Sequence, residues 1–139
     1  MIWRLYPIAI LVGLAFGTLV QVLCLVPGVM LLVLTSADPL SEDMAATILQ
    51  ETRSHVLVLA SLVVAYLAAG YTAARFAAGE ELVNAIATGV VLAGLGLSAQ
   101  VGKTPWNVLP AWVDWVALAI AIPVALAGGL LFRRRAFAA

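Results

Sequence analysis

Four long runs of apolar residues divide the chain, and each is long enough to cross a lipid bilayer as a helix. They cover residues 5–34, 56–76, 82–99 and 112–132. A membrane-spanning helix needs about 20 apolar residues, because each residue advances about 1.5 Å through a hydrocarbon layer about 30 Å thick. The first run also exceeds the apolar core of a signal peptide, which is about 7–15 residues long. We therefore predict an all-α fold, a four-transmembrane-helix bundle forming one integral membrane domain over residues 1–139.

Residues 36–54, between the first two apolar runs, form the largest hydrophilic segment of the chain. Within it, apolar residues recur at helical spacing opposite acidic, amide and hydroxyl side chains. These apolar residues are Leu40, Met44, Ile48 and Leu49. We therefore predict an amphipathic extramembrane segment between the first and second helices. It is either a solvated extension of the second helix or a surface that docks lipid headgroups or a partner protein.

The segment between the second and third runs is short and predicts a tight helical hairpin. Arg75 falls in the last turn of one helix, and Glu80 and Glu81 begin the next. Both placements complement the helix dipoles. Gly79 lies between them, and glycine readily adopts the left-handed conformation that ends many helices. We predict that Gly79 ends the second helix.

Each predicted helix carries small residues at four-residue spacing, which places them on one helix face. The glycines that we assign to such faces are Gly13, Gly17, Gly70 and Gly89. Small side chains allow the backbones of two membrane helices to approach closely. We therefore predict that these glycines lie in helix–helix contacts, either within the bundle or between copies of an oligomer.

The most polar stripe within the predicted spans lies on the first helix. Gln21 falls near its middle, Cys24 lies on the same face, and Thr18 is adjacent. An amide without a partner is costly in hydrocarbon, so Gln21 should face the bundle or a water-filled cavity. In a structural role it would bond to another helix, with Ser61 and Thr88 the nearest hydroxyls in depth. The alternative is a ligand site or pore lined by Gln21, Thr18 and Cys24.

Several classes of activity lack the residues that they need. No Asp, Glu, Lys or Arg lies in the middle of an apolar run, whereas proton-coupled exporters and many ion pathways require one. The single cysteine excludes an intramolecular disulfide, and the only histidine, His55, has no partner at metal-ligand spacing. We expect no catalysis, no cofactor and no metal. With a formal net charge of zero, nothing favours nucleic-acid binding.

Aromatic residues flank the predicted spans, where the headgroup region satisfies both an apolar ring and a polar N–H group. Trp112 and Trp115 begin the fourth run, so we predict that they are interfacial anchors. His55 lies at the edge of the second run, and we interpret it as an ordinary interfacial residue.

Positive charges beside the apolar runs predict the orientation of the protein. With four crossings, both termini and the turn near Arg75 share one side of the membrane. That side holds five basic residues against two on the other: Arg4, Arg75, Arg133, Arg134 and Arg135 against Arg53 and Lys103. We predict a multi-pass protein of a bacterial inner (plasma) membrane, with both termini in the cytoplasm. The abundance of alanine, leucine and valine is typical of that membrane.

Gly70 and Tyr71, followed by Arg75, a short gap and a helix containing Gly89, occupy the central third of the chain. This arrangement resembles small four-span bacterial membrane proteins of uncharacterised function, and the resemblance implies a four-helix fold without a particular activity. We expect a small integral inner-membrane protein with a structural, accessory or lipid-handling role. Its partners would be the lipid bilayer and either a second copy or another membrane protein. The alternative is an oligomeric transporter or channel component with a polar path near Gln21, lined by Gln21, Thr18 and Gln100.

Overall fold

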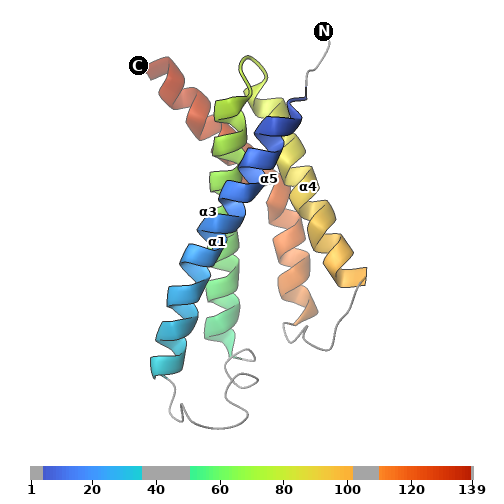
Figure 1. Ribbon diagram of the computed structural model, residues 1–139. Helices are drawn as coiled ribbons and strands as arrows, with labels where there is room; N and C mark the ends of the chain where they lie inside the picture. Colours follow the sequence, from blue (N-terminus) through green and yellow to red (C-terminus); the bar gives the residue numbers. More distant parts are fainter. Residues whose placement is uncertain (1–4, 36–50, 102–109, 139) are drawn as a thin grey trace.

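The computed structural model describes residues 5–35, 51–101 and 110–138. They form four helices, α1 (Pro7–Thr35), α3 (Thr52–Phe76), α4 (Glu81–Val101) and α5 (Ala111–Ala138). All four are long and apolar enough to cross a membrane, by length and composition, and the described residues contain no strand. The structure (Figure 1) confirms the predicted all-α, four-helix bundle.

Two helices extend by about a turn or more beyond the apolar runs that predicted them. α3 begins at Thr52 rather than at residue 56, and α5 continues to Ala138 rather than ending at residue 132. The added turns carry basic residues, Arg53 in α3 and residues 133–135 in α5. An apolar run marks the part of a helix that suits lipid, whereas backbone hydrogen bonding continues through polar residues that favour helix. The end of the predicted amphipathic segment thus belongs to α3, and its residues 36–50 lie outside the described residues.

α3 and α4 form the predicted helical hairpin. α3 ends at Phe76, and the Ala77 N–H donates to the Ala74 carbonyl oxygen at 3.2 Å, which tightens the last turn. Gly79 has a positive φ of 85° in the connection that follows, and its N–H donates to Oε1 of Glu81 at 3.3 Å. The left-handed glycine is present, but it shapes the turn and does not end α3. That part of the prediction is wrong because the tightened turn at Ala77 has already closed the helix.

α3 lies at the centre of the arrangement. It packs against α1 and α5, while α4 packs mainly against α5 and has few contacts with α1. The α1–α3 and α4–α5 pairs diverge toward the end of the bundle opposite the α3–α4 turn (Figure 1). The start of α1 and the end of α5 lie at the same end as that turn. The helices are therefore arranged as four successive crossings.

Small residues fill the interior of the bundle. Its fully buried apolar side chains are nearly all alanines, such as Ala69 of α3 and Ala125 of α5. Large apolar side chains lie outside, including the exposed Phe16, Leu19 and Leu23 of α1. Lipid tails are as apolar as these side chains, so in a membrane the helices are held together by close packing of small residues. This distribution is typical of a bundle surrounded by lipid.

Candidate functional site

α1 packs against α3 through Gly13 and Gly17, both of which are buried. A Cβ atom added to Gly13 would lie 2.7 Å from the Ala69 carbonyl oxygen, and one added to Gly17 would lie 2.8 Å from Ala69 Cβ. Both distances are shorter than van der Waals contact, so a side chain at either position would push the helices apart. The glycines of α1 therefore bring its backbone directly against the alanine stripe of α3.

α5 packs against α3 and α4 through contacts of the same kind. A Cβ atom on Gly70 of α3 would collide with the Ala125 backbone, 2.6 Å from its carbonyl carbon. One added to Gly89 of α4 would lie 2.8 Å from Cα of Ile122. All four glycines assigned from the sequence thus lie where two helices of one chain meet. Gly94 of α4 differs, because nothing lies within 4 Å of a Cβ added there.

The candidate polar stripe of α1 lies only partly inside the bundle. Gln21 and Cys24 are half-buried, and the Cys24 thiol is free. Thr18 is exposed, and its hydroxyl donates to the Leu14 carbonyl oxygen of its own helix at 2.9 Å. Within the described part of the chain, the Gln21 amide forms no hydrogen bond. The three residues therefore share a helix without sharing an enclosed site.

The two hydroxyls expected nearest to Gln21 are bonded within their own helices. Ser61 Oγ donates to the Val58 carbonyl oxygen at 2.8 Å. Thr88 Oγ1 donates to the Asn84 carbonyl oxygen, also at 2.8 Å. Serine and threonine in helices often bond to a carbonyl three or four residues earlier. Both side chains are buried, and this local bond lets each of them donate without an amide from another helix.

A buried amide that the sequence analysis missed joins the start of α1 to α4. Asn84 is fully buried, and its Oδ1 accepts a hydrogen bond from the Tyr6 N–H at 2.7 Å. Its Nδ2 donates to the Glu80 carbonyl oxygen at 2.9 Å. Tyr6 caps α1, since its carbonyl oxygen accepts from the Ile10 N–H at 3.1 Å. The sequence did offer a signal for this contact, because Asn84 lies inside the apolar run of residues 82–99. An amide without a hydrogen-bond partner is costly there, so a partner could have been expected.

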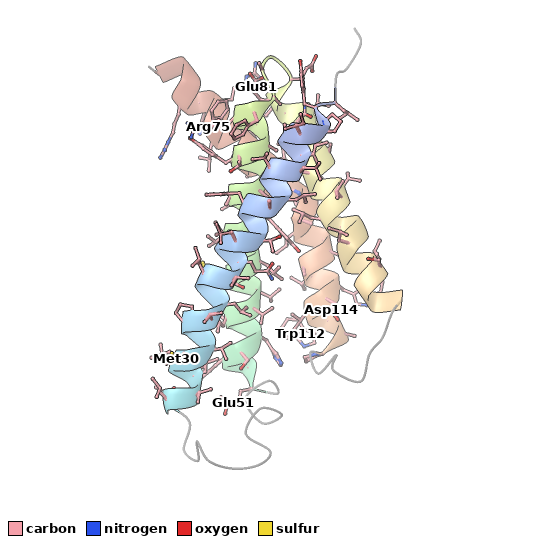
Figure 2. All side chains as sticks on the ribbon, viewed as in Figure 1. Met30, Glu51, Arg75, Glu81, Trp112 and Asp114 are labelled. Carbon is pink, nitrogen blue, oxygen red and sulfur yellow. The ribbon has the colours of Figure 1, made fainter. Side chains whose placement is uncertain are left out.

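At the opposite end of the bundle, α3 and α5 meet through two rings. The ring centroids of His55 and Trp112 are 5.6 Å apart, and the ring planes are nearly perpendicular at 89°. His55 is only 6% exposed, so its ring packs between two helices, a contact that its position in the sequence did not predict. Trp112 is about half exposed at the start of α5 (Figure 2), in keeping with a headgroup anchor. This edge-to-face contact holds α3 beside α5 at that end.

The described residues contain no group of three or more His, Cys, Asp or Glu side chains that could hold a metal ion. Comparisons of the chain with protein-family models, curated proteins and solved structures found no match. Three structural features bear on function: a core of small residues, the buried Asn84 amide at one end of the bundle, and the contact between the His55 and Trp112 rings at the other.

Proposed function

We propose that this protein is a small integral membrane protein with a structural, accessory or lipid-handling role and without catalysis. The observation that carries the proposal is the way in which the interior is filled. Glycines and alanines bring helix backbones into contact, and the buried side chains of Asn84, Thr88 and Ser61 bond to backbone groups. Such an interior favours a rigid scaffold, whose outward faces contact lipid or another membrane helix.

We further propose that the protein resides in a bacterial inner (plasma) membrane with both termini in the cytoplasm. The five-to-two division of basic residues supports this orientation. The start of α1, the α3–α4 turn and the end of α5 share one end of the bundle, which is where most of these charges belong.

α1 is the helix best placed to contact a partner. It packs mainly against α3, and it exposes Phe16, Leu19 and Leu23. In a bilayer this surface contacts acyl chains, and it is also free for a helix of a second copy or of another membrane protein. The proposed partners are therefore the bilayer itself and one such helix.

One observation favours a second candidate, an oligomeric transporter or channel component. Gln21 is half-buried as a residue, and its amide forms no hydrogen bond within the described residues. An amide left unpaired in hydrocarbon costs several kcal/mol, which a water-filled path or a polar group from a second copy would remove. The transport reading therefore depends on Gln21, whereas the structural reading does not.

A flux measurement in proteoliposomes separates these candidates. Vesicles that contain the purified protein are loaded with carboxyfluorescein or with a pH-sensitive dye, and release or acidification is compared with that of protein-free vesicles. We expect no difference. Flux above the protein-free level that Gln21→Leu abolishes and Thr35→Val preserves would overturn the structural role and establish a transport path. Thr35→Val is the matched control, because it removes a hydroxyl at the far end of α1 that is already bonded to the Leu31 carbonyl oxygen of the same helix.

A further inference from the structure

A groove of about 320 Å³ lies between α3 and α5. It is lined by Leu67, Ala68 and Tyr71 of α3 and by Leu131 and Arg135 of α5. Leu67 and Tyr71 are one helical turn apart, as are Leu131 and Arg135, so each helix contributes one row of side chains. Each row places an apolar residue nearer the middle of its helix and a polar or charged residue nearer the α3–α4 turn.

The groove opens because α3 and α5, which pack closely along much of their length, separate beyond their contact at Gly128. At Gly128 the backbones are in direct contact, since an added Cβ atom would collide with the Leu67 carbonyl oxygen and lie 2.9 Å from the Tyr71 nitrogen. Beyond that point α5 leaves the bundle (Figure 1). Leu131 and Arg135 lie about one and two turns past the contact, on the diverging part of α5.

One wall of the groove is held in place by aromatic packing. The Tyr71 ring meets the Phe132 ring edge to face, with centroids 5.5 Å apart and an interplanar angle of 86°. Phe132 follows Leu131 directly and is half-buried. The rings fix the position of Tyr71 relative to α5, so the groove is bounded on the α3 side by a side chain with little freedom.

The chemistry of the lining is amphipathic and cationic. Leu67 and Leu131 offer apolar surface, Arg135 supplies a guanidinium group, and none of the five lining residues is acidic. Arg135 lies in the last turns of α5 together with Arg133, at the same end of the bundle as the α3–α4 turn; Arg75 lies at this end of α3 (Figure 2). A planar guanidinium group is suited to bidentate contact with a phosphate.

We propose that this groove binds one anionic phospholipid, with an acyl chain along Leu67 and Leu131 and the headgroup phosphate at Arg135. The volume lies at the low end for ligand pockets, which are about 300–1,000 Å³. It therefore takes the phosphate and the adjoining part of one chain, while the rest of the lipid remains in the bilayer. Lipid binding in the groove goes beyond the structural role proposed above. It depends on that role only in requiring that the protein is inserted in a membrane.

Native mass spectrometry of the detergent-purified chain tests the proposal. Phosphatidylglycerol and phosphatidylcholine with identical 16:0/18:1 chains are added in equal amounts. We expect one phosphatidylglycerol to be retained in preference to phosphatidylcholine. Arg135→Gln should weaken its binding about fivefold, the effect of losing one basic residue that faces an anionic lipid. Leu131→Trp, which fills the groove, should abolish its binding.

Two neighbouring residues provide matched controls. Arg134→Gln removes the same charge from the same helix, and Leu130→Trp adds the same ring, yet neither residue lines the groove. Each should change binding by less than about twofold, below the effect of one basic residue at a lipid surface. Circular dichroism melts establish that all four variants are folded.

Three results would refute the proposal that the groove binds an anionic phospholipid. The first is equal retention of the two lipids by wild-type protein, and the second is an equal loss of phosphatidylglycerol in the Arg134 and Arg135 variants. The third is a dimer without bound lipid that Leu131→Trp dissociates, since a second copy would then be the occupant. If the chain is recovered from carbonate-washed membranes, any of these results leaves the structural role intact. Failure to sediment with membranes would refute both proposals.

Discussion

Gly70→Ala should separate α3 from α5 at their closest contact. The added Cβ atom would collide with the Ala125 carbonyl oxygen and lie 2.6 Å from the carbonyl carbon, against an ordinary contact distance of at least 3.4 Å. The helices would have to part by at least about 0.8 Å, the difference between 3.4 and 2.6 Å, which loses about a quarter to a half of the dispersion energy of nearby contacts. Overpacking of this kind costs about 1–3 kcal/mol. Because both partners are helix backbone, we expect a cost of about 2–3 kcal/mol after the gain in helix propensity.

Gly94→Ala provides the matched control, because a Cβ atom there meets nothing within 4 Å. It makes the same chemical change inside a membrane helix without a steric clash. Its only expected effect is the higher helix propensity of alanine, which favours folding by at most about 1 kcal/mol. Unfolding of both variants in mixed micelles, followed by circular dichroism as the SDS fraction rises, gives their relative stabilities. Identical midpoints for Gly70→Ala and Gly94→Ala would refute the inferred backbone contact. A midpoint for Gly94→Ala well below wild type would show instead that any added methyl group destabilises the bundle.

The remaining predictions concern the two ends of the bundle. Asn84→Ala should destabilise the protein by about 1–3 kcal/mol, because it leaves the part-buried Tyr6 N–H without its acceptor; an unchanged mixed-micelle midpoint would contradict this. A double-mutant cycle of His55→Ala and Trp112→Ala should give a coupling of about 0.5–1.5 kcal/mol, whereas additive effects would mean that the rings do not interact. In a background without the native cysteine, an impermeant thiol reagent added to intact cells should label Glu51→Cys and spare Glu80→Cys. The reverse pattern would invert the proposed topology.

The helices could be predicted from the sequence because run length alone decides whether a segment crosses a bilayer. Helix ends were harder to predict, since hydropathy falls at the first charged residue while the backbone continues as helix. The start of α3 at Thr52 and the end of α5 beyond Arg133 are both of this kind. Gly79 shows a different kind of error. Its left-handed conformation was predicted correctly, but it shapes the connection between α3 and α4 and does not end α3.

Contacts between distant segments could not be predicted in the same way. The four assigned glycines indicated close packing, but glycine spacing does not specify which helix faces which. Asn84 is informative only when the start of α1 is known to lie beside α4, and His55 only when α5 is known to begin beside α3. The groove at Arg135 depends on the path of α5 past Gly128, which hydropathy does not encode.

The hydrogen bond between Tyr6 and Asn84 joins residues 78 positions apart. Ribosomes add about 5–20 residues per second, so roughly 4–16 s separate synthesis of the donor from synthesis of its acceptor. In a chain that inserts while it is translated, the Tyr6 N–H just before α1 is bonded to water or headgroups during that interval. α1 can therefore pack against α3 as soon as α3 has been synthesised, whereas the bond that joins the start of α1 to α4 forms only after Asn84 has been added.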